Sequence, residues 1–256
     1  DDGLCIKSGR DEEGRKRAMP TEDVIIRHCT VYNSHGGFVI GSEMSGGARN
    51  IFVDDCTFVG SDIGLRFKTT RGRGGVVENI YINNISMKNI PGEAILFDMY
   101  YMAKDPIALD GEKRDAPKVE LLPVTDATPQ FKNIYIKNVV CDGAESALFI
   151  RGLPEMNINS IHLENVMINA RHGIEISEAK NISLKNINIT AEKEGPLVEI
   201  LNSSDIRFQS FNTGKQAQVS ISGDRTANIL WQNSAGIDPQ TSSFGSGATQ
   251  QGIQVK

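Results

Sequence analysis

The sequence has 256 residues, with 27 Lys and Arg against 32 Asp and Glu and 39% hydrophobic side chains. This composition can fill the core of one large domain and excludes a mainly disordered chain. The net charge of −5 provides no basic surface for nucleic acid, and no apolar run approaches the ~18 residues of a membrane-spanning helix. Four cysteines without a CxxC pair predict neither a disulfide scaffold nor a thiolate metal site. We expect no cofactor, no metal, no nucleic-acid partner and no membrane partner.

A repeated cassette runs through the chain. The segment 79–87 returns with substitutions at 133–139 and 181–187, and eight copies can be aligned on the residue that precedes the first aliphatic side chain. These anchors are Asp23, Asn50, Asn79, Asn133, Ser160, Asn181, Asp205 and Asn228, with spacings of 27, 29, 54, 27, 21, 24 and 23. The spacing of 54 is either two periods or one period with an insert. Repeats of this length predict a solenoid.

The positions within each cassette show what one repeat contains. The first and third residues after the anchor are apolar in all eight copies, and the residue between them is mixed, which predicts a strand with one buried face. The fifth place is usually Asn, a residue that tolerates left-handed backbone, so a bend is expected there. The residues at this fifth place are His28, Asp55, Asn84, Asn138, Asn165, Asn186, Ser210 and Asn233.

A second short strand follows most cassettes. These strands are expected at 37–40, 64–67, 94–97, 147–150, 173–176, 196–200 and 218–221. Short strands, bends at fixed positions and a period of 21 to 29 residues predict an all-β fold, a right-handed parallel β-helix. A propeller blade needs roughly 40 residues and leucine-rich repeats have another consensus, so both alternatives fit less well.

Two segments depart from this rhythm. Residues 102–130 are too long for a turn and have a centre rich in Lys, Arg and Asp, so we expect a long loop insert that flanks a cleft. Residues 235–256, rich in Ser, Gly, Thr and Gln, are expected to form a tail or cap. All of residues 1–256 then belong to a single β-helix domain.

Candidate functional residues gather on three successive second strands. Aligning the strands that begin near residues 4, 38 and 65 places them side by side on neighbouring turns. Because Leu65 and Phe67 are expected to point inward, their neighbours on the strand must point outward. Carboxylates, an imidazole and two cations then meet on one solvent-facing surface, with His35 about 5 Å from the Asp pair. These residues are Asp1, Asp2, His35, Arg66 and Lys68. Tyr100 and Tyr101, just before the insert, are further candidates.

At these residues the chain resembles the polygalacturonases, glycoside hydrolase family 28. That family carries Asn-Thr-Asp, Gly-Asp-Asp, Gly-His-Gly and Arg-Ile-Lys motifs, and Asp1-Asp2, Ser34-His35-Gly36 and Arg66-Phe67-Lys68 match the last three in order and in similar spacing. The run 40–47 looks especially like bacterial exo-acting members. Gly3, Ser34 and Phe67 are small departures, since the family often has Cys, Gly and Ile there. The Asn-Thr-Asp motif, with its third aspartate, is not found before Asp1, so the resemblance implies the C-terminal part of a longer enzyme.

The resemblance implies a set of roles. Asp1 would be the general acid, Asp2 would share the base role with the third aspartate, and His35 would orient or polarise a catalytic carboxylate. Arg66 and Lys68 would bind a uronate carboxylate, and we add Tyr100 and Tyr101 as candidate sugar contacts. The implied reaction is hydrolysis, with inversion and exo action, of α-1,4-linked galacturonic acid in a pectic oligo- or polysaccharide by a secreted or periplasmic enzyme.

Two alternatives remain. A pectate-lyase-like β-helix would use calcium and eliminate rather than hydrolyse, but no clear outward Asp cluster is found, since Asp54-Asp55 belongs to the other set of strands. A non-catalytic carbohydrate-binding β-helix also fits a chain in which the third aspartate is not found.

Overall fold

The computed structural model describes residues 1–101, 120–237, 242–250 and 253–255, and nearly all regular structure in it is strand. One short helix, α1 (Asp11–Arg17), lies between the first two strands. The strands are β1 (Leu4–Ile6), β2 (Thr21–Arg27), β3 (Thr30–Tyr32), β4 (Phe38–Gly41), β5 (Ala48–Val59), β6 (Leu65–Lys68), β7 (Val76–Asp98), β8 (Gln130–Arg151), β9 (Ile158–Ser177), β10 (Ala179–Ala191), β11 (Pro196–Leu201), β12 (Ser204–Ser222), β13 (Ala227–Gln232), β14 (Ala235–Ile237), β15 (Ser243–Gly245) and β16 (Ile253–Val255).

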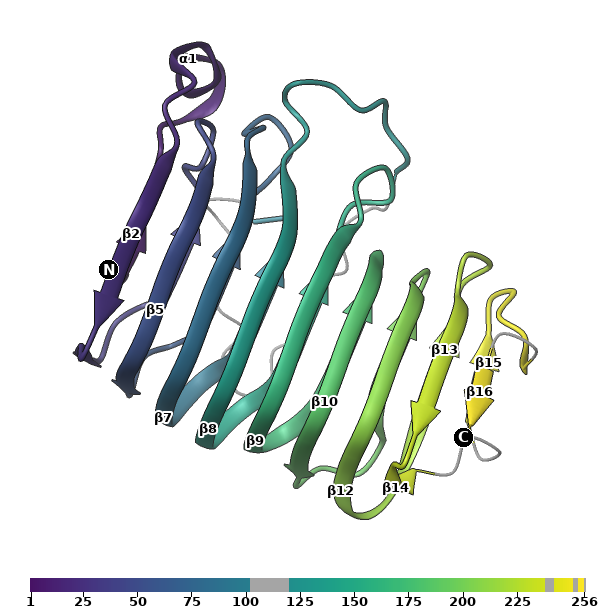
Figure 1. The fold of residues 1–256 in the computed structure, drawn as a ribbon. Helices are drawn as coiled ribbons and strands as arrows, with labels where there is room; N and C mark the ends of the chain where they lie inside the picture. The colour runs from purple at the N-terminus through teal and green to yellow at the C-terminus, as the bar shows by residue number, and fades with distance from the viewer. Residues whose placement is uncertain (102–119, 238–241, 251–252, 256) are drawn as a thin grey trace.

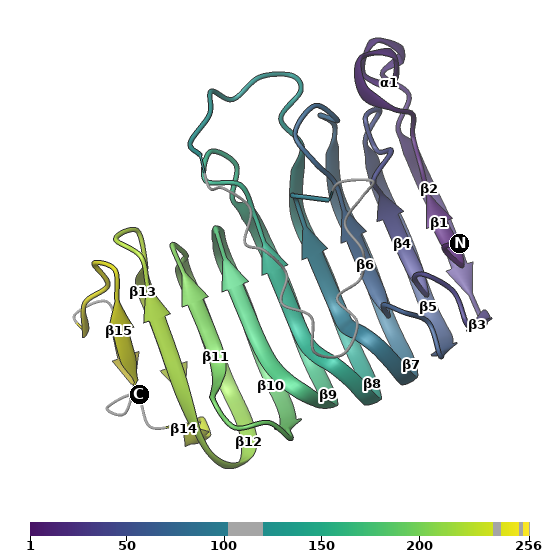
Figure 2. The same ribbon diagram turned by 180° about the vertical axis from the view of Figure 1, so that it is seen from behind.

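The strands stack in chain order, each turn beside the next, as Figures 1 and 2 show from two sides. Neighbouring strands pair in parallel, so the chain must return to the same end after every turn, and such crossovers are right-handed in nearly all proteins. The fold is a right-handed parallel β-helix, as the sequence predicts.

The register confirms the cassette alignment. One row of aliphatic residues lies in register along the helix: Ile51, Ile80, Ile134, Ile161, Ile182, Ile206 and Ile229. Because Ile80 pairs directly with Ile134, the spacing of 54 residues is one turn with an insert rather than two turns.

Left-handed backbone marks two bends in every cassette. All eight anchors and all eight residues at the fifth place have φ between 49° and 57°. Asn, Asp and Ser supply most of these positions because their short polar side chains satisfy neighbouring groups at bends. Asn side chains also bond from turn to turn, for example Asn165 to Asn138 and Asn186 to Asn165, both at 3.0 Å. The sequence predicted the second bend and missed the first.

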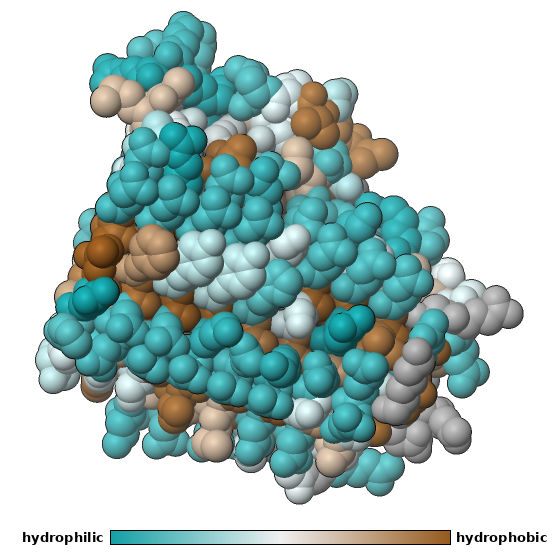
Figure 3. All heavy atoms as spheres, in the orientation of Figure 1, coloured by the Kyte–Doolittle hydropathy of each residue, from teal (hydrophilic) through white to brown (hydrophobic). Residues whose placement is uncertain are grey.

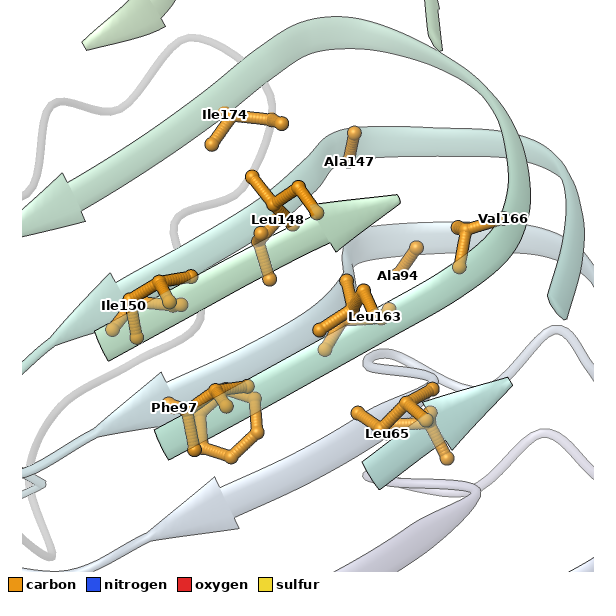
Figure 4. Close-up of a cluster of buried hydrophobic side chains, with 14 of the residues drawn as sticks. Leu65, Ala94, Phe97, Ala147, Leu148, Ile150, Leu163, Val166 and Ile174 are labelled. Carbon is orange, nitrogen blue, oxygen red and sulfur yellow. The ribbon is translucent and has the colours of Figure 1, made fainter. Parts of the chain in front are cut away.

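The interior is a continuous apolar column. Figure 4 shows side chains from β6, β7, β8 and β9, among them Leu148 and Leu163, gathered in the space that the turns enclose. Near the N-terminal end the column becomes aromatic. The ring of Phe67 stacks on Phe97 at 4.4 Å between centroids and meets Phe38 and Phe131 edge-on. These four residues are fully buried.

Replacement of Phe67 by Ala is expected to lower the free energy of unfolding by about 3–5 kcal/mol, because the cavity would open between three other rings. Urea unfolding followed by circular dichroism measures this loss. Phe52→Ala is the matched control, since the Phe52 ring is 44% exposed on the outside of β5. Equal losses in the two variants would contradict the assignment of Phe67 to the core.

A row of aromatic rings runs along the outer surface of β5, β7, β8 and β9. Phe52, Tyr81, Tyr135 and His162 stack on successive strands with centroids 5.0, 5.2 and 4.8 Å apart. In Figure 3 this face is largely hydrophilic, with a paler band running across it. The rings cover one another's faces, so the row extends the turn-to-turn packing to the outside of the helix.

The two irregular segments are described in part. Residues 120–129 contain no strand, and residues 102–119 of the predicted insert 102–130 lie outside the described residues. Within 235–256, β14 and β15 pair with β12, and β16 pairs with β13. Among the described residues, no helix has the length and apolar character needed to cross a membrane.

Candidate active site

Three second strands, β1, β4 and β6, lie side by side at the N-terminal end of the helix (Figure 2). Leu4 is in register with Phe38, and Phe38 with Leu65, as the sequence alignment predicts. This register brings the N-terminal aspartates close to the two cations of β6, two turns away.

A buried ion cluster forms on the outer side of these strands. The Lys68 ammonium donates to Asp2 Oδ2 at 2.8 Å, and Arg66 Nη1 lies 3.7 Å from Asp2 Oδ1. All three side chains are 5–8% exposed. The expectation that the cations face solvent is therefore wrong. They point away from the apolar interior, as strand alternation requires, but they are covered on the outside.

Burial and charge act together on this cluster. Desolvation lowers the pKa of Lys68, the nearby Arg66 charge lowers it further, and the hydrogen bond to Asp2 opposes both. Two cations share one carboxylate, so the cluster carries a net positive charge. Asp2 Oδ1 and Arg66 Nε are both buried without a hydrogen bond from the described residues. The site is thus suited to an additional anionic or polar group.

Asp1 and His35 form the solvent side of the same site. Both residues are exposed, and the His35 amide donates to the Asp1 carbonyl oxygen at 3.1 Å. The Asp2 amide donates to Asp1 Oδ1 at 2.7 Å, and the His35 carbonyl accepts from Arg66 Nη1 at 3.2 Å. One aspartate therefore faces solvent, and its neighbour in sequence is enclosed by cations.

Cys5 is a site neighbour that the sequence reasoning missed. Its Sγ lies 3.8 Å from Asp2 Oδ2, and burial raises the pKa of this thiol. Strand alternation contains the signal, because Cys5 is the outward residue between Leu4 and Ile6. Within the part of the chain that the structure describes, no three His, Cys, Asp or Glu side chains are grouped so that they could hold a metal ion.

The two tyrosines have different places. The Tyr101 ring lies 5.0 Å from Lys68 Nζ and 5.5 Å from Arg66 Cζ, which places it over both cations. Tyr100 instead lies between Arg71 and Arg151, at 5.3 and 5.4 Å, and burial raises its pKa. Of the two candidate sugar contacts, the structure brings Tyr101, not Tyr100, to the cluster.

Comparison with known proteins identifies the family. Residues 1–145, more than half of the chain, match the model of the glycosyl hydrolases family 28. The chain belongs to this family, which confirms the family that the sequence resembles.

Individual relatives point the same way. A probable polygalacturonase of Vitis vinifera is 30% identical over 66% of this chain and 31% of its own length. A polygalacturonase of Ralstonia solanacearum is 38% identical over 38% of this chain and 19% of its own length. The crystal structure of a hyperthermoactive exopolygalacturonase from Thermotoga maritima superposes with a TM-score of 0.62 and 29% identity, covering 73% of this chain and 38% of that one. The chain thus spans well under half the length of each of these proteins.

Proposed function

We propose that the full-length protein hydrolyses α-1,4-linked galacturonic acid in pectic chains with inversion. The observation that carries this proposal is the buried, net positive cluster of Asp2, Arg66 and Lys68 directly beside exposed Asp1 and His35. Membership in family 28 and relatives named polygalacturonases support the choice of substrate. A pectic substrate lies outside the cell, so we also propose a secreted or periplasmic enzyme.

The different surroundings of the two aspartates suit different roles. Inverting hydrolysis needs one acid that protonates the leaving oxygen and one carboxylate that activates water. Asp1 lies beside Asp2 and His35 without an ion pair to the two cations among the described residues, and it takes the acid role. Asp2 is paired as a carboxylate with two cations and has a buried oxygen free of hydrogen bonds from the described residues, so it takes a share of the base role. His35, held through its backbone to Asp1, orients the acid.

Arg66 and Lys68 take the uronate carboxylate. A guanidinium has five N–H donors and an ammonium three, and the contacts to Asp2 and His35 use only part of them. The remaining donors can hold a second carboxylate. Tyr101 contributes its ring to the same subsite. For Tyr100, buried between two arginines, we propose a supporting place beside this subsite.

Lys68→Met combined with Arg66→Gln is expected to cost roughly 1.5–3 kcal/mol in transition-state binding for each charge-assisted hydrogen bond to the substrate that is removed. The measurement is kcat/KM of the full-length enzyme on trigalacturonate. Lys185→Met is the matched control, because Lys185 pairs with Glu164 on another face of the helix. Equal turnover by the wild type and the double variant would remove the substrate assignment.

Product analysis tests the reaction itself. Hydrolysis adds water across the bond, elimination leaves an unsaturated uronide that absorbs in the ultraviolet, and a binding module gives neither product. We propose exo action, supported by the similarity of the run 40–47 to bacterial exo-acting members and by the exopolygalacturonase structure. Early release of a single small product, without intermediate lengths, is the expected result, and a ladder of intermediate oligomers would contradict it.

A further inference from the structure

We infer that the buried ion pair between Asp98 and Arg151 is a positioning device that holds Tyr101 over Lys68 and Arg66. The inference concerns the turns next to the candidate site, β6, β7 and β8, which lie side by side in Figure 2. Its consequence for substrate binding rests on the proposed function.

The ion pair continues the row of the site lysine. Lys68 on β6 is in register with Asp98 on β7, and Asp98 with Arg151 on β8. Arg151 donates to both carboxylate oxygens of Asp98, from Nε to Oδ1 and from Nη2 to Oδ2, each at 2.9 Å. The Asp98 and Arg151 side chains are 5% and 12% exposed. Two parallel hydrogen bonds fix the orientation of both groups, which a single point contact cannot do.

The same carboxylate fixes the backbone that leads to Tyr101. β7 ends at Asp98, and Asp98 Oδ1 accepts the Tyr100 amide at 3.0 Å. The Met99 amide donates to the Arg151 carbonyl at 2.9 Å, on the β8 side. The Tyr101 amide donates to the Thr69 carbonyl at 2.9 Å, on the β6 side. The chain leaving β7 is therefore tied to both neighbouring turns, and the ring of Tyr101 comes to lie over the cations.

The energetics favour a geometric role for the pair. Burying two charges carries a large desolvation cost, and apolar replacements of buried pairs are often as stable. Stability alone therefore does not account for Arg151 and Asp98 at these positions. Their specific contribution is to fix the path of the chain after β7, because the Asp98 carboxylate accepts hydrogen bonds from both the Arg151 guanidinium and the Tyr100 backbone amide.

A fluorescent reporter at position 101 tests the positioning directly. Tyr101→Trp adds an indole to a chain whose one other Trp, Trp231, is buried in the core. In this background Arg151→Met is expected to raise acrylamide quenching of the added indole by about twofold to fivefold, because the ring is no longer held against the cations. Arg151→Lys should give an intermediate value, since a lysine keeps the charge but not the fork. Arg171→Met, a partly exposed arginine on β9, is the control and should leave quenching unchanged.

Trigalacturonate affinity of the full-length enzyme provides the second readout. Arg151→Met and Tyr101→Leu should each weaken binding about fivefold, and the double variant no further, because both act through one ring. If Arg151→Met does not fold, Asp98→Asn replaces it. Unchanged quenching in a folded variant, or additive losses of affinity, would overturn the inference. Raised quenching with unchanged affinity would support the positioning role and reject the proposed uronate contact of Tyr101.

Discussion

Replacement of Asp1 by Asn in the full-length enzyme is expected to slow hydrolysis of polygalacturonate by a factor of about 10²–10⁴, with little change in substrate affinity. The amide keeps the shape of the side chain but cannot supply a proton to the leaving oxygen. The amide also keeps the Oδ1 that accepts the Asp2 backbone N–H. Steady-state kinetics on defined oligomers separates the expected fall in kcat from any change in KM.

An aryl galacturonide with an acidic phenol as leaving group provides the control for this role. Such a leaving group departs without protonation, so Asp1→Asn should impair its hydrolysis far less than that of the polymer. If both substrates lose activity equally, Asp1 is not the general acid, and a role in activating water would have to be considered for it.

Asp2→Ala is expected to have the largest effect on stability within the site. Lys68 and Arg66 would remain buried without their counter-charge, a loss of about 3–5 kcal/mol in similar buried pairs. Turnover should also fall, because the variant lacks the carboxylate that we propose to activate water. Chemical denaturation measures the free energy of unfolding, and Asp1→Ala serves as the exposed, adjacent control that should remain near wild type.

A second substitution shows whether the charge itself is responsible. Asp2→Ala combined with Lys68→Met removes one of the two stranded cations and should recover part of the stability, while activity stays low. The single variant Lys68→Met gives the reference loss of unfolding free energy. If adding Lys68→Met to Asp2→Ala lowers the free energy of unfolding by that same amount, the two side chains are not coupled, contrary to what the 2.8 Å contact indicates.

The β-helix was predictable because its rows of side chains are visible in the sequence. Residues such as Ile80 and Ile134 must be apolar to face the interior, and Asn84 and Asn138 sit where the backbone turns left-handed. The bend at anchor residues such as Asn79 escaped prediction, although its residue types are the same. An Asn before a strand is also typical of an ordinary turn, and only the φ values distinguish the two.

The position of the candidate site on the β-helix was predictable, but the burial of its side chains was not. Strand alternation determines that Arg66 and Lys68 leave the interior, and stacking of turns places them near Asp2. Alternation says nothing about what covers an outward side chain, so the burial of this cluster could not be foreseen. A related limit explains why the sequence could not tell which of Tyr100 and Tyr101 reaches the cluster. Both residues follow the end of β7, where strand alternation no longer determines the direction of a side chain.

The two left-handed bends of each cassette are always five residues apart, while the distance from one cassette to the next varies from 21 to 54 residues. Change in length is therefore confined to the connections outside this segment. Figure 1 shows α1 and the described part of the β7–β8 connection projecting from the same end of the strands. A residue inserted between the two bends of a cassette would turn the side chains that follow it to the wrong face of the strand and disturb the stacking of the turns. An added residue at that projecting end changes only the shape of the rim. New contacts can arise there in evolution while the supporting framework is inherited unchanged.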